Sequence, residues 1–235
     1  MEKAYLHKNI QTEFIDSSLF ERNAWNRQAY ICGIDEVGRG CFFGPVVTAA
    51  VILHPHKTHP LLQDSKLLTE KKRLEVVPWI YKNAWVSIGY QTPYAIDTYN
   101  IYKATQKAML QALHNLLTLA HTPTPEKILI DAMPLNTPLY QGSIVSLIKG
   151  ENKSISIAAA SLVAKVHRDA LITRMASSFP LYTLHTHKGY GSKKHRDALA
   201  IYGASCMHRT SFLKNIPQKN ILLYESNHDK QTTIC

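Results

Sequence analysis

The amino-acid sequence predicts an α/β fold: a mixed five-stranded sheet flanked by helices, with a helical extension toward the C-terminus. Three observations support this prediction. The first three predicted strands are joined by comparatively short connections, which favours an antiparallel meander. The later segments alternate between strand and helix, which favours a parallel extension of the same sheet. A hydrophobic content of 45% in 235 residues is sufficient to bury a sizeable core.

The predicted strands are short runs of apolar or alternating residues bounded by turn-forming residues. They cover residues 29–34, 45–53, 84–91, 127–131 and 142–148. The first two are joined by a segment that contains Gly38, Gly40 and Gly44, which indicates a connection with unusual backbone demands.

The predicted helices follow from apolar residues at helical spacing and from N-capping residues. Thr69 caps a helix through residue 82, in which Pro78 marks a kink or an end. Longer helices are predicted over 95–119 and 154–178, and a shorter one over 192–202. We therefore expect an N-terminal arm over 1–29, holding irregular structure or a short helix, a main domain over 30–213 and a polar tail over 214–235.

The charge balance favours a polyanionic partner. Lys and Arg number 27 against 17 Asp and Glu, a net charge of +10, which fits nucleic acid, an anionic membrane surface or a merely soluble basic protein. The four cysteines form no CxxC pair, and the N-terminus lacks an apolar leader segment. We expect a cytoplasmic protein without a membrane span, and we interpret the histidine-rich segments 54–59 and 185–195 as solvated loops.

Four acidic residues are candidate metal ligands. Asp35 and Glu36 end an apolar strand, and Asp131 ends the strand KILID, where α/β sheets usually place ligands. Asp169 lies on a predicted helix, in line with Ser161 and Lys165 at a spacing of four residues. Taken singly, each has an ordinary interpretation: a solvated strand end, a loop start, or an ion pair with Lys165. If all four converge, they require cations, and Mg²⁺ is the natural occupant.

Six segments in order resemble the ribonuclease HII family. They are GIDEVGRG at 33–40 with GPVVTAAVIL at 44–53, DSK at 64–66, the NI stretch at 100–101, SIAAASLVAKVHRDAL at 156–171, KGY at 188–190 and HRTSF at 208–212. The resemblance covers about residues 30–213 and implies an RNase H-like fold with a helical C-terminal addition. The related ribonuclease HIII would show GTG in place of GRG and an extra N-terminal domain, for which residues 1–29 are too short.

The resemblance also implies the site. It places Asp35, Glu36, Asp131 and Asp169 around two Mg²⁺ or Mn²⁺ ions during catalysis. It implies that Gly38-Arg39-Gly40 contacts the ribose 2′-hydroxyl and that Tyr190 packs on the sugar, with further substrate contacts at Lys66, Ser161 and Lys165. Glycines suit the first role because they allow the main chain to approach a ribose closely.

Three departures from the family pattern concern loops. Cys41-Phe42-Phe43 replaces small or apolar residues after GRG, Ala132 stands where a glycine is usual, and Glu151 stands where the family tends to have Asp. None of them removes a predicted metal ligand.

The predicted function is endonucleolytic hydrolysis of the RNA strand of RNA–DNA hybrids and nicking at single ribonucleotides in duplex DNA, leaving 3′-hydroxyl and 5′-phosphate ends. Two alternatives are a non-catalytic nucleic-acid-binding protein and an RNase H-fold nuclease that acts on DNA junctions. We expect a monomer, and residues 218–224 faintly resemble a sliding-clamp-binding peptide.

Overall fold

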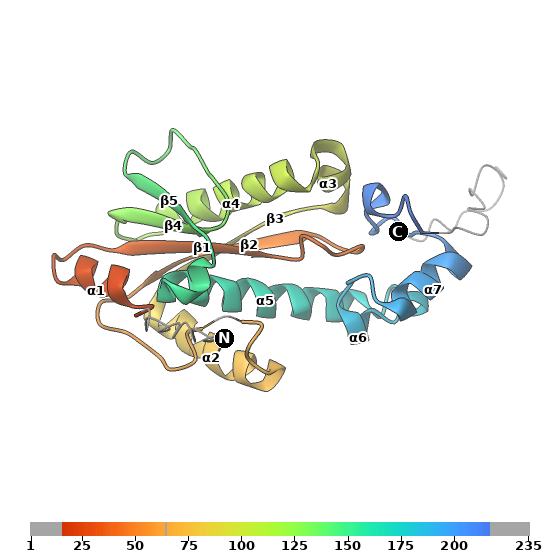
Figure 1. The fold of residues 1–235 in the computed structure, drawn as a ribbon, viewed down its shortest axis with the longest axis horizontal. Helices are drawn as coiled ribbons and strands as arrows, with labels where there is room; N and C mark the ends of the chain where they lie inside the picture. Colours follow the sequence, from red (N-terminus) through yellow and green to blue (C-terminus); the bar gives the residue numbers. More distant parts are fainter. Residues whose placement is uncertain (1–15, 64, 217–235) are drawn as a thin grey trace, which may run out of the picture.

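The computed structural model describes residues 16–63 and 65–216. Its centre is a five-stranded sheet in the order β3-β2-β1-β4-β5 (Figure 1). The strands are β1 (Ile31–Val37), β2 (Val46–Leu53), β3 (Ala84–Gln91), β4 (Lys127–Asp131) and β5 (Ser143–Leu147). β1, β2 and β3 pair antiparallel, whereas β4 pairs parallel with both β1 and β5. The predicted mixed sheet is confirmed.

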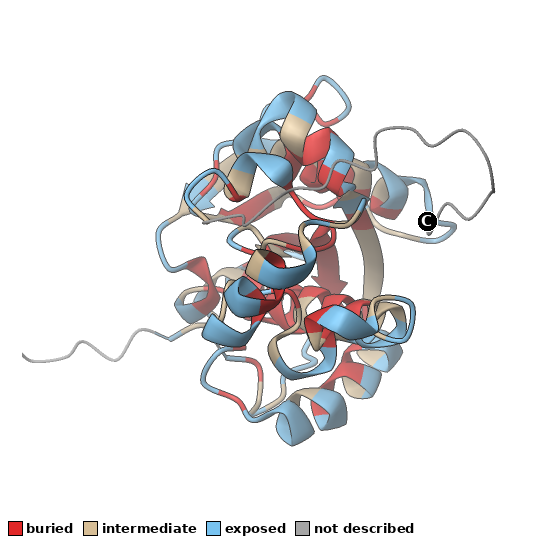
Figure 2. Ribbon diagram, turned by 90° about the vertical axis from the view of Figure 1, so that its right-hand side faces the viewer, coloured by how far each residue is buried: buried red, intermediate tan, exposed pale blue. Residues whose placement is uncertain are grey.

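Helices cover both faces of the sheet. α4 (Ile101–Thr118) packs on one face, and α5 (Ile155–Met175) with α2 (Glu70–Asn83) packs on the other (Figure 1). The remaining helices are α1 (Leu19–Trp25), α3 (Pro93–Tyr99), α6 (Leu184–His187) and α7 (Lys193–Tyr202), with 3₁₀ turns η1 (Gly150–Asn152), η2 (Pro180–Tyr182) and η3 (Thr210–Phe212). Buried residues concentrate on the sheet and on the inner sides of these helices (Figure 2).

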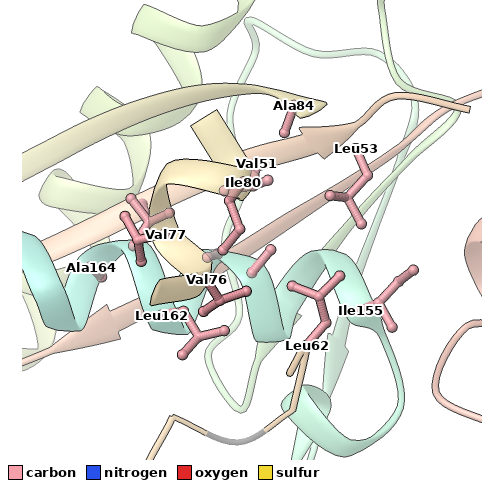
Figure 3. Close-up of a cluster of buried hydrophobic side chains, with 14 of the residues drawn as sticks. Val51, Leu53, Leu62, Val76, Val77, Ile80, Ala84, Ile155, Leu162 and Ala164 are labelled. Atoms are coloured by element: carbon pink, nitrogen blue, oxygen red, sulfur yellow. The ribbon is translucent and has the colours of Figure 1, made fainter. Parts of the chain in front are cut away.

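The core follows from the alternation of side chains along β2, whose eight residues are all buried. Val51 and Leu53 pack with Leu162 and other residues of α2 and α5 (Figure 3), whereas Ala50 and Ile52 pack against α4 on the opposite face. Neighbouring strand residues point to opposite faces, so a strand covered on both faces must be apolar throughout. Full burial of each large aliphatic side chain contributes about 1.5–3 kcal/mol.

The capping residues explain where the helices begin. The Thr69 hydroxyl accepts a hydrogen bond from the Lys72 N–H, as predicted. Ser154 caps α5 in the same way. Pro78 does not end α2, which continues to Asn83.

The single helix predicted over 95–119 is wrong, because the chain breaks into α3 and α4 at Asn100. Asn100 has a φ of 68°, and its side chain accepts a hydrogen bond from the Lys103 N–H at 3.0 Å. Asparagine tolerates this left-handed backbone and caps the second helix from it. The apolar spacing continues across the break, which is why periodicity alone missed it.

The C-terminal elements form an addition at one end of the sheet (Figure 1). Phe43, in the connection between β1 and β2, packs with Ile172 of α5, Leu184, Leu199 and Leu213 in one buried cluster. Isolated bridges join Cys41 to Tyr190 and Phe43 to His208. Among the described residues, no helix combines the length and apolarity needed to cross a bilayer.

Candidate active site

Asp35 and Glu36 occupy the last part of β1, beside the parallel partner β4. Asp35 is 7% exposed. One of its carboxylate oxygens accepts the Glu36 N–H at 2.7 Å, and Ser161 of α5 donates a hydrogen bond to it. Glu36 pairs with Arg39 at 3.3 Å, and its Oε2 is buried without a hydrogen-bond partner. Both predicted carboxylates therefore lie in a shielded corner between β1 and α5.

Asp131 ends β4, the strand next to β1. Its Oδ1 accepts a hydrogen bond from the Gly150 N–H of η1 at 2.8 Å, which fixes the orientation of the carboxylate. Its charge reaches both Asp35 and Glu36, since it contributes to raising the pKa of each. Three of the four predicted acids are thus close enough to interact.

Asp169 lies on α5, and its carboxylate is paired with Lys165 at 3.0 Å, one helical turn earlier. Its side chain is 13% exposed. Its negative charge also acts on Tyr190. The ion pair with Lys165, the ordinary interpretation of the sequence spacing, is therefore present in the structure.

The electrostatics of the corner favour a cation. Burial, and then the charge of Glu36, raise the pKa of Asp35 well above its usual range. Burial raises the pKa of Glu36 too, against the opposing effect of Arg39. Carboxylate oxygens that repel one another, one of them lacking any partner, are donors suited to a hard divalent cation. The described residues nevertheless contain no group of three or more His, Cys, Asp or Glu side chains already arranged to hold an ion.

The Gly38-Arg39-Gly40 turn leaves the end of β1 directly beside these acids. Gly38 has a φ of 88°, and a Cβ there would lie 2.1 Å from Nε of Arg168. Gly40 differs: it is exposed, and a Cβ there would meet no atom within 4 Å. The fold therefore requires a glycine at 38, whereas nothing within the described chain requires one at 40.

Two buried arginines, which the sequence patterns did not single out, hold this turn. Arg168 of α5 donates to the carbonyl oxygens of Phe43, Pro45 and Lys188. Arg209 donates to the carbonyl oxygens of Arg39 and Gly44. Each is 0% exposed. Arg168 is next to Asp169, and Arg209 lies within HRTSF, so both are in segments that carry the family resemblance. That resemblance was the one feature of the sequence that could have pointed to them.

Tyr190 stands over the same region at the junction with the C-terminal addition. It is 40% exposed, and its ring faces Lys165, whose Nζ lies 5.4 Å from the ring centroid. Its hydroxyl hydrogen-bonds the Cys41 sulfur. Partial burial raises the pKa of Tyr190 to about 12, so its hydroxyl is neutral. The structure thus brings Tyr190 together with Lys165 and Asp169.

The further predicted substrate contacts, Ser161 and Lys66, differ in kind. Ser161 is buried, and its hydroxyl lies 2.9 Å from that of Ser65, so Ser65, Ser161 and Asp35 form a chain of hydrogen bonds. Ser161 therefore supports Asp35, in addition to any role toward a substrate. Lys66 is exposed, and its positive charge acts on Glu36.

The departures in the loops have structural consequences. Phe42 and Phe43 donate main-chain hydrogen bonds to the Gly189 carbonyl, so this segment joins the sheet to the C-terminal addition. Ala132 has a φ of 47°, which for a residue with a Cβ costs about 1–2 kcal/mol relative to ordinary helical backbone. Glu151 is buried in η1 beside the residue that orients Asp131.

The interpretation of 185–195 as a solvated loop is wrong for two of its histidines. His195 is 0% exposed, and its Nε2 lies 3.0 Å from Nε2 of the buried His208. The ring of His187 stacks on that of His195 at 4.5 Å. Spacing in the sequence gave no sign of His208, which comes from a segment 13 residues later.

Comparisons with known proteins agree with this geometry. The family model described as Ribonuclease HII matches residues 32–215. A ribonuclease HII from Bacillus cereus is 46% identical over 228 residues, covering 93% of this chain and 85% of the relative. The structure resembles the Archaeoglobus fulgidus protein in a PCNA:RNase HII complex, with a TM-score of 0.65 and 24% identity over 81% of this chain and 98% of that one.

A more distant structure, Bst-RNase HIII in complex with Mn²⁺, has a TM-score of 0.53 and 17% identity, covering 76% of this chain and 72% of the other. At this identity the similarity concerns the fold alone, and it agrees with the RNase H-like sheet described above. The sequence relatives and the matched family model together are decisive: this chain belongs to the ribonuclease HII family, and it is an enzyme of the metal-dependent nuclease class.

Proposed function

We propose that this member of the ribonuclease HII family cleaves the RNA strand of RNA–DNA hybrids and nicks duplex DNA at single embedded ribonucleotides, leaving 3′-hydroxyl and 5′-phosphate ends. The observation that carries the proposal is the placement of the Gly38–Gly40 turn. Arg39 of that turn pairs with Glu36, so a segment able to approach a ribose adjoins the mutually repelling acids.

The acids supply the metal site in this proposal. Asp35, Glu36, Asp131 and Asp169 would hold two divalent cations, Mg²⁺ or Mn²⁺. Such ions would offset negative charge on the phosphodiester and would lower the pKa of a bound water molecule, so that a hydroxide nucleophile is available near neutral pH. The orphaned Oε2 of Glu36 and the raised pKa of Asp35 support this assignment. Asp169 joins the group when Lys165, its present partner, turns toward a substrate phosphate. The Mn²⁺ in the Bst-RNase HIII complex is consistent with this class of ion.

Recognition of RNA rests on a rigid main chain. Arg168 and Arg209 fix the shape of the turn by donating hydrogen bonds to main-chain carbonyl oxygens. Arg209 donates to the Arg39 carbonyl within the turn, and Arg168 donates to the Phe43 carbonyl just after it. A rigid turn pairs with a 2′-hydroxyl, which both donates and accepts hydrogen bonds, and a deoxyribose leaves the same groups unpaired. Tyr190 packs on the adjacent sugar, and Lys66 contacts a phosphate in this scheme.

The remaining parts of the proposal concern partners and location. A net charge of +10 suits a nucleic-acid duplex. The PCNA in complex with the Archaeoglobus fulgidus protein is consistent with a weak sliding-clamp contact through 218–224, but those residues lie outside the described part of the chain. We further propose a cytoplasmic monomer.

A duplex DNA with one ribonucleotide tests the function directly. With Mg²⁺ or Mn²⁺, the wild type should nick it once and leave 3′-hydroxyl and 5′-phosphate ends. Asp35→Asn should lower cleavage by at least about 100-fold with binding nearly intact, whereas Asp197→Asn on the exposed side of α7 should cut normally. An intact substrate after incubation with folded wild type contradicts the function, and an active Asp35→Asn enzyme removes Asp35 from the site.

A further inference from the structure

The outer side of α4 and the end of α3 carry exposed aromatic and basic side chains together. Tyr99 and Tyr102 are each 43% exposed, and Lys103 and Lys107 are exposed beside them. Nζ of Lys107 lies 4.1 Å from the ring centroid of Tyr99. We call these four residues the α4 tyrosine–lysine surface. Such residues have no role in the core, since α4 buries its opposite side against the sheet.

Both charged residues of this surface are lysines, and no acidic residue lies near them in the sequence. The sequence has no Asp or Glu from residue 98 to residue 125. The preceding acid, Asp97, accepts four hydrogen bonds from the main-chain N–H groups and hydroxyls of Thr210 and Ser211. Exposed helices usually carry charges of both signs. A surface whose charged residues are lysines, set beside exposed tyrosines, is therefore complementary to a polyanion.

Two contacts link the helices that carry this surface to segments of the candidate active site. Gln106 of α4 donates a hydrogen bond to the Pro134 carbonyl at 2.8 Å, in the loop that follows Asp131. On the other side, Asp97 of α3 holds η3, which follows Arg209, the residue that binds the Arg39 carbonyl. α3 and the first turn of α4 lie near the end of the sheet that carries the C-terminal addition (Figure 1).

The tyrosines decide which part of a nucleic acid fits. In a duplex the base faces are already stacked, and only phosphates and groove edges are available. Unpaired bases offer their faces, and stacking on an aromatic ring stabilises binding regardless of sequence, while lysines follow the backbone. We propose that the α4 tyrosine–lysine surface binds unpaired nucleotides of a strand that extends from the substrate duplex. The inference rests on the proposed function for its substrate, whereas its binding test does not require cleavage.

Fluorescence anisotropy of the full chain, without added metal, with a labelled oligothymidylate of about ten nucleotides measures this binding. Tyr99→Ala/Tyr102→Ala should weaken it by about 30-fold or more, because the stacking of two bases is lost. Tyr99→Phe/Tyr102→Phe keeps the rings and should stay near wild type. Lys103→Gln/Lys107→Gln should reduce the slope of log affinity against log salt by about 1.4, since two phosphate contacts are lost.

Tyr202→Ala is the matched control, because Tyr202 is also exposed, at 52%, but lies on α7. It should bind the oligonucleotide like wild type. Nicking of a blunt duplex at its ribonucleotide should be unchanged in Tyr99→Ala/Tyr102→Ala. If the proposed function is wrong, the wild type itself will fail to nick this duplex, whereas the difference in oligonucleotide binding between wild type and the alanine pair tests the surface alone. The inference is overturned if Tyr99→Ala/Tyr102→Ala binds the oligonucleotide as tightly as wild type, or if Tyr202→Ala loses as much affinity as that pair. It is also overturned if the alanine pair loses as much affinity for a blunt duplex as for the oligonucleotide.

Discussion

Individual carboxylates at the site oppose the stability of the fold that holds them. Asp35 is buried beside Glu36, and the charge of Asp131 also acts on it. Its pKa is therefore raised well above the usual range. When a carboxyl group has a higher pKa in the folded chain than in the unfolded chain, the folded state becomes less stable as pH rises through the range between these two pKa values. Ser161 and the Glu36 N–H offset part of this cost. The arrangement is understandable when a cation completes it.

The two glycines of the GRG turn should respond differently to a single methyl group. Gly38→Ala should destabilise the protein by about 3 kcal/mol, because it combines a φ of 88° with a Cβ position 2.1 Å from Arg168. Gly40→Ala should leave the free energy of unfolding within about 0.5 kcal/mol of wild type, since a Cβ at this position would meet no atom within 4 Å. Urea unfolding measures both.

The same pair separates folding from substrate recognition. Gly40→Ala places its methyl group on the open side of the turn, where the sugar is proposed to bind, and should lower cleavage at a single ribonucleotide by about 100-fold. Ala132→Gly serves as a control for glycine content near the site, because it relieves a positive φ without touching the turn. A Gly40→Ala enzyme that is stable and fully active would show that this residue does not meet the substrate.

At the scale of elements, the C-terminal addition is held by histidines with defined tautomers. Ser205 donates its N–H to Nδ1 of His208, so His208 carries its proton on Nε2 and donates to Nε2 of His195. His195 then donates from Nδ1 to the Tyr190 carbonyl at 2.9 Å. This directed chain requires both rings to be neutral. Through it, the segment around residue 205 positions the main chain of Tyr190.

Acid should therefore loosen the addition. Burial lowers the pKa of His195 to about 4 and that of His208 to about 3. The unfolded chain takes up these protons first, near pH 6.5, so stability falls as pH decreases from about 6.5 toward 4. Each histidine contributes a slope of up to about 1.4 kcal/mol per pH unit. The free energy of unfolding, measured with urea at several pH values in this range, should change less steeply with pH for His208→Gln than for wild type.

A control variant makes this result specific. His114→Gln changes an exposed histidine on α4 and should keep the wild-type slope. The raised pKa values of Asp35 and Glu36 act in the opposite direction, and they are common to all three proteins, so they cancel in the comparison. Identical slopes for His208→Gln and wild type would contradict the assignment of neutral, buried rings.

The elements predicted from the sequence were those whose signals are local. Strand alternation and capping by Thr69 depend on neighbouring residues, and the sheet and this cap were confirmed. The break at Asn100 was missed because apolar spacing continues through it. Arg168 and the His195–His208 pair depend on contacts between distant segments, which spacing in the sequence does not report.

At the scale of the whole molecule, the proposed site draws its residues from three separate elements. Asp35 and Glu36 come from β1, Asp131 from the neighbouring parallel strand β4, and Asp169 from α5, which crosses the face of the sheet. The sequence supported each candidate, but only the pairing of β1 with β4 places Asp131 near the first two. Asp169 remains a predicted ligand, since its partner in the structure is Lys165.

Metal binding should therefore stabilise the folded chain as a unit. A ligand that binds only the folded state at about 100 times its dissociation constant adds about 2.7 kcal/mol, which for a chain of this size raises Tm by roughly 5–10 °C. We expect Mg²⁺ or Mn²⁺ to produce such a shift in wild type, relative to EDTA, in differential scanning fluorimetry. Asp35→Asn should be about 1 kcal/mol more stable than wild type in EDTA, because it removes a buried repelling charge, and should lose most of the metal-dependent shift.

Asp131→Asn and Asp169→Asn extend the same measurement to the other two elements, with Asp197→Asn as an exposed control that should keep the full shift. Loss of the shift in Asp169→Asn would require the Lys165 pair to open when the ion binds, because Lys165 is paired with that carboxylate in the structure. Lys165→Gln should then increase the apparent metal affinity, since the competing partner is gone. A full shift in Asp169→Asn would instead confine the ion to the β1–β4 corner.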